Sequence, residues 1–270
     1  MPELPEIYCR AKEMNQSLPS KQILSIEIIQ PKCLNLTPDV FSSALSNAVI
    51  EEVPYHGKWI KTKTTAGWLL INLGMGGEIL LTLRENIPDN YRLVIDFTDK
   101  TCLVIHYWWF GYAYYAPLNR LDSIPMVARL GPNVIDLSRE DFSSLLRNQN
   151  PKTRVIAFLL DQSKVAGIGN AYIHNILFLA GLHPLRTISS MAEKEINHLY
   201  LAILAGLKPS LEKGGTVYEF NLCGEKGGFK VEDILIGYKA GSLCPRCGTL
   251  IEKNSHRQYK LIYLSRLPVP

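Results

Sequence analysis

Two hydrophobic periods follow one another in the first part of the chain. Apolar residues recur at helical spacing at Ile7, Ala11, Met14 and Leu18, which predicts an amphipathic helix over residues 6–18. After it, short period-two runs separated by Gly, Asn, Asp and Pro predict strands at 23–30, 49–53, 59–64, 68–73, 79–83, 93–97, 102–106 and 112–116. Such a series is typical of a β-sandwich or barrel, with the first helix packed against it.

The second part of the chain has mainly helical patterns, at residues 139–147, 152–161, 170–180 and 191–212. Prolines 117, 125 and 132 punctuate the connection before them, and two short strand patterns follow Cys244 and Cys247. We therefore predict an α+β, multidomain fold. Its predicted parts are a first domain (1–117), a linker (118–133), a helical domain (134–222), a glycine-rich loop (223–235) and a terminal β-hairpin (236–270).

Charge and composition narrow the function classes. The 270-residue chain has a net charge of +4, and from residue 151 onward 15 Lys and Arg face 9 Asp and Glu. That excess favours a polyanionic partner, although it also suits an ordinary solvated surface. The six cysteines are scattered, and we find neither a leader segment nor a run of about 18 apolar residues. We expect a protein without a membrane span, cytoplasmic and, if bacterial, nucleoid-associated.

The N-terminus carries candidate chemistry. If Met1 is removed, Pro2 presents a secondary amine beside the carboxylate of Glu3, and an α-amine with a reference pKa near ~8 is partly nucleophilic at neutral pH. Its attack on a sugar carbon would give an iminium, while Glu3 moves protons. The alternative is that proline and acidic residues simply suit a helix N-terminus. A retained Met1 would make Pro2 an ordinary amide.

A second motif lies between two helical patterns. The glycines of Gly167-Ile168-Gly169-Asn170 permit close backbone approach, and exposed amides at a helix N-terminus form a phosphate site. The alternative is a plain αα-turn in which Asn170 caps the second helix.

The motifs taken together carry a resemblance. The chain contains the sequences PELPE at 2–6, GK at 57–58, LGM at 73–75, FG at 110–111, GIGN at 167–170, GGT at 214–216 and CPRC at 244–247. In this order they resemble the formamidopyrimidine-DNA glycosylase and endonuclease VIII family over almost the whole chain. The resemblance implies an N-terminal catalytic β-sandwich, a helix-two-turn-helix DNA-binding domain, a lesion-capping loop and a finger-like β-hairpin.

The resemblance also implies a function. The implied function is that of a base-excision repair enzyme that is both a DNA glycosylase and an AP lyase. Such an enzyme flips and removes a damaged, oxidised base and cleaves the strand by β/δ-elimination. Pro2 would form the Schiff base, Glu3 would be the acid/base, Lys58 would hold a phosphate at the catalytic centre and Glu6 would support it. The partner would be double-stranded DNA with a damaged base or abasic site. We expect a monomer that needs no cofactor.

Further residues take roles from the same resemblance. Phosphate binding falls to Gly169, Asn170, Tyr238 and Lys239, and the gap left by the flipped base is filled by Met75, Trp109 and Phe110.

At Trp109 the family usually has an arginine that reads the orphaned base. An indole has one donor and cannot repeat that bidentate contact. The alternative is that Trp108 and Trp109 alternate in a strand, with one indole in the core.

The terminal hairpin departs from the family as well. Cys244 and Cys247 have metal-ligand spacing, but Leu264 and Leu267 stand where a second cysteine pair would be. A structural zinc site needs four ligands, and His256 could supply only a third, so we predict a degenerate, zinc-less finger with an apolar core. Tyr259 replaces the finger's usual arginine, and four basic residues remain for phosphates: Lys253, Arg257, Lys260 and Arg266.

A last departure is the pair His174-Asn175, which replaces two acidic residues common in the family. It leaves the choice of lesion open. An alternative function is that of a diverged, non-catalytic protein that binds damaged DNA. The presence of Pro2, Glu3 and Lys58 favours the enzyme, because a pure binding protein needs none of them.

Overall fold

The computed structural model describes residues 1–256 and 259–264. Its contacts divide the chain into two units, residues 1–129 with 213–228, and residues 130–212 with 229–270. The predicted domain boundaries at residues 117, 133, 222 and 235 remain predictions. None of the helices in the described part combines the length and apolar character needed to cross a lipid bilayer.

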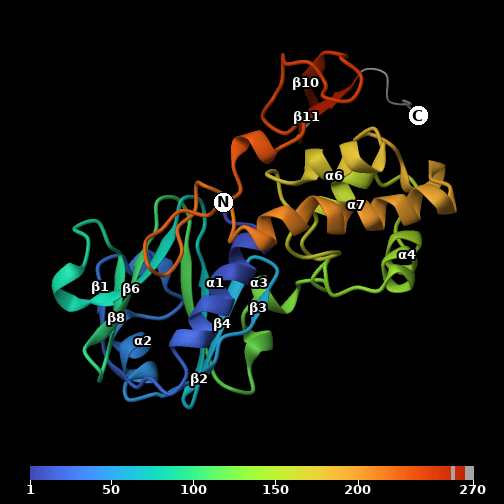
Figure 1. Ribbon diagram of the computed structural model, residues 1–270. Helices are drawn as coiled ribbons and strands as arrows, with labels where there is room; N and C mark the ends of the chain where they lie inside the picture. Colours follow the sequence, from blue (N-terminus) through green and yellow to red (C-terminus); the bar gives the residue numbers. More distant parts are fainter. Residues whose placement is uncertain (257–258, 265–270) are drawn as a thin grey trace. The chain divides into compact units, whose positions relative to one another are not determined.

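The first unit is built on two antiparallel sheets (Figure 1). One has the strand order β1-β7-β8-β6, from Ile23–Ile28, Leu93–Phe97, Thr101–His106 and Glu78–Leu83. The other has the order β2-β4-β5-β9, from Ile50–Glu52, Trp59–Thr64, Gly67–Asn72 and Tyr112–Ala116, with β3 (Tyr55–His56) paired to β4. The predicted β-sandwich is confirmed. Sequence periodicity missed β3 because a two-residue strand is too short to show a period.

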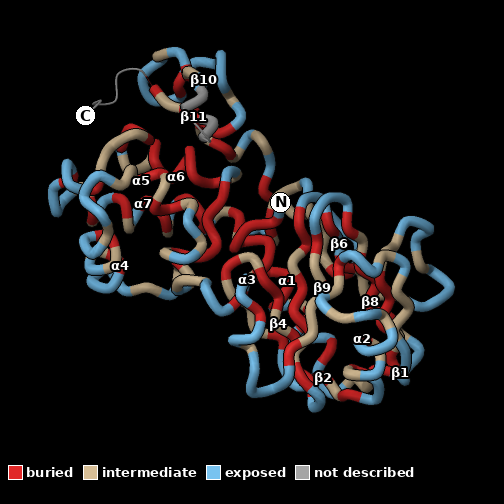
Figure 2. Tube along the Cα trace, turned by 180° about the vertical axis from the view of Figure 1, so that it is seen from behind, coloured by how far each residue is buried: buried red, intermediate tan, exposed pale blue. Residues whose placement is uncertain are grey.

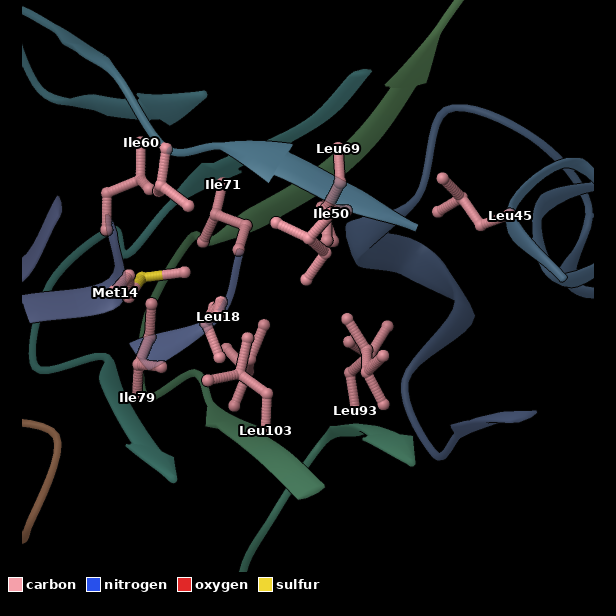
Figure 3. Close-up of a cluster of buried hydrophobic side chains, with 14 of the residues drawn as sticks. Met14, Leu18, Leu45, Ile50, Ile60, Leu69, Ile71, Ile79, Leu93 and Leu103 are labelled. Carbon is pink, nitrogen blue, oxygen red and sulfur yellow. The ribbon is translucent and has the colours of Figure 1, made fainter. Parts of the chain in front are cut away.

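Apolar side chains from both sheets fill the space between them. Figure 3 shows Ile60, Leu69 and Ile71 of one sheet near Ile79, Leu93 and Leu103 of the other. Helix α1 (Leu4–Ser17) packs beside β3 and β4 and contributes its predicted apolar face, including Met14 and Leu18, which are fully buried. Burying such side chains stabilises the unit by roughly 1.5–3 kcal/mol each.

Short helical pieces complete the first unit. Helix α2 (Pro38–Leu45) was not predicted, yet it buries Phe41 and Leu45, whose spacing of four residues places them on one face. The remaining pieces are η1 (Pro31–Cys33), η2 (Arg84–Asn86), η3 (Leu121–Ser123) and α3 (Pro125–Ala128). In Figure 2 inner strands such as β4 and β8 are mainly buried, whereas the edge strands β1 and β6 are mainly intermediate or exposed.

The second unit is mainly helical, as predicted. It contains α4 (Arg139–Arg147), α5 (Val155–Leu160), α6 (Ile173–Ala180), η4 (Ile188–Ser190), α7 (Glu193–Glu212) and η5 (Val231–Asp233). Helices α6 and α7 lie side by side (Figure 1). The unit ends in an antiparallel hairpin of β10 (Ile251–His256) and β11 (Tyr259–Leu264), in register from Ile251–Leu264 to His256–Tyr259.

Candidate active site and nucleic-acid interface

The start of α1 holds the predicted nucleophile and acid/base residue in a buried setting. Pro2 is buried and Glu3 is only 3% exposed. Glu3 is the N-cap of α1: its backbone N–H donates to Glu6 Oε2 at 2.9 Å, and its side chain accepts from the Glu6 backbone in a capping box. The alternative that this stretch suits a helix N-terminus is therefore confirmed, and the catalytic roles of Pro2 and Glu3 stay predictions; the same cap fixes the carboxylates of Glu3 and Glu6.

Glu6 also holds a segment that is distant in sequence. Residues 213–228, here called the return segment, come back to the first unit after α7. The Thr216 N–H donates to Glu6 Oε1 at 3.2 Å, and a Cβ at Gly215 (φ +96°) would lie 3.2 Å from Glu6 Cγ. The positive φ favours a glycine here, and a Cβ would also crowd the Glu6 side chain. Glu6 thus supports the site by using one oxygen for Glu3 and the other for the return segment.

Lys58 lies in the two-residue turn between β3 and β4, where Gly57 adopts φ +57°. The lysine is half-buried, and its backbone carbonyl accepts a hydrogen bond from Asn72 Nδ2 at 3.0 Å. Asn72 Oδ1 accepts from the Gly74 N–H at 3.0 Å. Asn72 therefore ties the Lys58 turn to the loop that carries Met75. The sequence offered no signal for this role.

The predicted void-filling residues lie on two loops that are joined to each other. Met75 and Trp109 form a β-bridge with N–H to O distances of 2.8 Å and 3.1 Å. A Cβ at Gly74 (φ +60°) would lie 2.3 Å from the Phe110 carbonyl oxygen, so only glycine permits this approach. The side chains of Met75, Trp109 and Phe110 are 46%, 57% and 66% exposed.

Trp108 is exposed as well, at 71%. The alternative in which one of the two neighbouring indoles enters the core is therefore wrong. The Trp108 ring instead lies edge-on to His106 at 6.3 Å between ring centroids. The rings of Trp109 and Phe110 contact each other edge-on, at 6.1 Å between ring centroids, and form an exposed aromatic surface that suits stacking on nucleic-acid bases.

In the second unit, the turn before α6 presents Asn170 at the surface. Helix α6 has Tyr172 as its N-cap and no side-chain cap, so the predicted capping role of Asn170 is wrong. The helical turn nevertheless begins at Gly169, whose carbonyl accepts from the Ile173 N–H at 3.1 Å. Asn170 is thereby left exposed for the phosphate contact that the sequence predicts.

Gln162 shapes this turn, a role that we did not predict from the sequence. Its Oε1 accepts from the Gly167 N–H at 2.9 Å, and its Nε2 donates to the Ile168 carbonyl at 2.8 Å. Below the turn, the buried Tyr172 hydroxyl donates to Ser210 Oγ of α7 at 2.6 Å. These contacts fix the backbone of Gly167 and Ile168 before Asn170 and join Tyr172 after it to α7.

The other predicted phosphate contacts, Tyr238 and Lys239, depend on Asn175. Its Oδ1 accepts from the N–H groups of Ile236 and Gly237, both at 3.1 Å. Tyr238 follows with φ +61° and is 65% exposed. Asn175 therefore has a structural role in this chain that a single sequence does not reveal.

Two titratable groups have shifted pKa values. Burial raises the pKa of Glu219 to about 7; the α-amino group of the chain opposes this, and the carboxylates of Glu6 and Glu78 add to it. Glu219 lies on the return segment. In the second unit, burial lowers the pKa of His174 to about 4, and its Nδ1 is buried with no hydrogen-bond partner among the described residues. His174 is thus a neutral core residue near neutral pH.

The terminal hairpin has an apolar core. Leu264 is 6% exposed and clusters with Cys244, Ile251 and Ile262, while Cys247 is exposed. Within the described residues no three His, Cys, Asp or Glu side chains gather as metal ligands, and two cysteines do not make the four-ligand site that structural zinc needs. Leu267, Arg257 and Arg266 lie outside the described residues, as do the side chains of His256, Tyr259 and Lys260.

The chain is similar in sequence to known protein families and relatives. Residues 1–107 match the formamidopyrimidine-DNA glycosylase N-terminal domain, and residues 130–221 match the formamidopyrimidine-DNA glycosylase H2TH domain. A formamidopyrimidine-DNA glycosylase of an Exiguobacterium species is 31% identical over 261 residues, 94% of each chain. That of Protochlamydia amoebophila is 31% identical over 266 residues, again 94% of each.

Among solved structures, the fold is similar to Lactococcus lactis Fpg in a complex with DNA containing an abasic site. The TM-score is 0.86 at 23% identity, over 97% of each chain. A second complex, of a Lactococcus lactis FPG mutant with DNA containing Fapy-dG, has a TM-score of 0.87 at 23% identity over 97% of this chain and 98% of that one. The predicted pairing of a β-sandwich with a helix-two-turn-helix domain is confirmed.

Proposed function

The chain belongs to the formamidopyrimidine-DNA glycosylase family, and from that premise we propose that it removes a damaged base from double-stranded DNA and then cleaves the strand. The observation that carries the proposal is the N-terminus. Pro2 and Glu3 are buried at the start of α1, and Glu6 holds the Glu3 backbone at 2.9 Å. This places a secondary amine, once Met1 is removed, next to two fixed carboxylates.

The chemistry follows from that arrangement. The Pro2 nitrogen attacks the sugar C1′ as the bond to the base breaks, and the base leaves with the bonding electrons and takes up a proton. Loss of the amine proton and opening of the sugar give an iminium, which withdraws electrons so that a C2′ proton can be removed and the 3′ phosphate expelled. Glu3 is the group placed to move these protons.

Binding of the DNA draws on exposed groups in each unit. In the first unit, Met75, Trp109 and Phe110 would fill the space left by the flipped base, and Lys58 would hold a phosphate. In the second unit, the exposed Asn170 with Gly169, and Tyr238 with Lys239, would bind phosphates. The expected substrate is an oxidised base or an abasic site, bound by a monomer in the cytoplasm where such DNA lies.

The experiment is excision from defined duplexes by protein whose intact mass shows that Met1 is absent. We expect release of an oxidised base followed by strand cleavage. Protein that binds these duplexes but neither releases a base nor cleaves an abasic site would instead support the second candidate, a non-catalytic protein that binds damaged DNA. The replacement of the family's arginine by Trp109 is the observation that favours this candidate.

We further propose that the terminal hairpin folds without zinc and that the protein needs no cofactor. The packing of Leu264 with Cys244 and Ile251 supports this, because one position of the missing ligand pair makes apolar contacts instead. We expect elemental analysis to find less than a tenth of an equivalent of zinc, and a chelator to leave the melting temperature unchanged. One tightly bound zinc per chain, lost in Cys244→Ser, would refute this.

A further inference from the structure

The return segment is attached to α1 at two points on one face of the helix. Glu6 accepts the Thr216 N–H at 3.2 Å, and Glu13 Oε2 accepts the Leu222 N–H at 2.9 Å. Residues seven apart lie two turns apart on the same side of a helix. The segment therefore runs along α1, the helix that directly follows Pro2 and Glu3.

Leu222 fixes the far end of this segment. Its side chain is 4% exposed and belongs to the core between the two sheets, and its carbonyl accepts from the Leu81 N–H at 2.9 Å. Around it the chain forms a small hairpin, closed by Asn221 N–H to the Glu225 carbonyl at 2.7 Å and Gly227 N–H to the Glu219 carbonyl at 3.0 Å. Leu222 directly precedes the predicted glycine-rich loop (223–235) and anchors the tip of this hairpin in the core.

Arg10 lies between the two attachment points. It is 3% exposed, and its guanidinium pairs with Glu13. A buried guanidinium is stable only with a partner, so the pair holds Glu13 in place to accept the Leu222 N–H. Glu219, on the same hairpin, interacts electrostatically with Arg10, with Glu6 and with the α-amino group of the chain.

We propose that Arg10 and Glu13 are positioning residues for base excision, because they dock the return segment on α1 and so hold it against Glu6 in the first turn of that helix. The inference rests on the proposed function. The segment that this pair positions lies against the carboxylates of α1, so its displacement should impair departure of the base. Cleavage of an abasic site, which has no base to release, should not depend on it.

The experiment compares two reactions in one set of variants. Glu13→Ala removes the acceptor for the Leu222 N–H, Glu13→Gln keeps an oxygen acceptor there, and Lys12→Ala changes an exposed neighbour on the same helix. We expect Glu13→Ala to slow single-turnover base release by roughly tenfold, the range for losing a hydrogen bond to a charged group. Cleavage of a preformed abasic site should stay within about twofold, while Glu13→Gln should recover most of base release and Lys12→Ala should match wild type.

Hydrogen exchange supplies the structural readout. The amides of Leu222 and Gly227 should exchange faster in Glu13→Ala and as slowly as wild type in Lys12→Ala. Arg10→Gln, which leaves Glu13 without its ion-pair partner, provides a second variant should Glu13→Ala fail to fold, and it should show the same selective loss.

The results that would overturn the inference are distinct from those that would overturn the proposed function. Wild-type rates of base release in both Glu13→Ala and Arg10→Gln, or an equal loss in both reactions, would refute positioning. Failure of Glu13→Gln to recover base release would do so too. Absence of both reactions in the wild type would instead refute the proposed function.

Discussion

At the scale of single residues, Glu219 is a carboxyl whose charge changes near neutral pH. Its pKa is raised by burial from 4.5 to about 7, so between these values the folded chain holds a proton that the unfolded chain has released. The higher proton affinity of Glu219 in the folded chain contributes to the free energy of unfolding. This contribution is fully present below pH 4.5 and is lost as the pH rises through 7.

We therefore predict that Glu219→Gln changes the pH dependence of stability. The variant should lose less free energy of unfolding than wild type between pH 5 and pH 8, because glutamine releases no proton. Urea unfolding at both pH values measures this. Parallel curves for the two proteins would show that Glu219 has an ordinary pKa in the folded state.

The sequence identified the residues with recognisable chemistry but not those that position them. Pro2, Glu3 and Lys58 belong to short local motifs. Glu13, by contrast, accepts its hydrogen bond from a residue 209 positions away, and Asn72 binds the backbone 14 positions away. A single sequence contains no period or motif that links such pairs, so the fold alone reveals them.

At the scale of elements, periodicity predicted the long helices and the strands to within a few residues. It missed α2 (Pro38–Leu45), since Phe41 and Leu45 give only one helical repeat. It also assigned α5 three residues too early, because α5 begins only at Val155, and the preceding backbone is held instead by a bridge between Arg154 and Thr187. Tertiary pairing, invisible in the local pattern, decided that boundary.

Asn175 links helix α6 to the segment that precedes Tyr238. We predict that Asn175→Ala lowers the free energy of unfolding by roughly 2–6 kcal/mol, because two buried N–H groups lose their acceptor at about 1–3 kcal/mol each. Affinity for duplex DNA should fall with it. Asn175→Asp keeps an oxygen acceptor and is the matched control; equal losses in stability from both variants would contradict the assignment.

At the scale of the whole molecule, the exposed aromatic surface should decide how the duplex is held. Bidentate contact by an arginine discriminates between bases by about 1–3 kcal/mol, and Trp109 cannot make it. Stacking contributes a similar ~1–3 kcal/mol but tolerates any base. We predict that excision is nearly indifferent to the opposite base. Trp109→Ala should weaken DNA binding roughly tenfold or more while hardly changing that preference.

Single-turnover excision of one lesion opposite each of the four bases measures the preference. Trp108→Ala removes the neighbouring exposed indole and is the matched variant for Trp109→Ala. A strong preference for cytosine in the wild type would mean that another residue reads the orphaned base.

In the proposed mechanism, the Pro2 amine forms a covalent bond with the sugar. Borohydride reduction of the protein mixed with abasic-site DNA, followed by mass mapping of the linked peptide, tests it most directly. We predict a reducible complex at Pro2 in protein that lacks Met1, strongly weakened in Pro2→Gly, with Glu3→Gln impairing base release more than cleavage of a preformed abasic site. The covalent role of Pro2 would be contradicted if Met1-free protein formed no trapped complex under conditions where a related glycosylase does. A link at a lysine would contradict it as well.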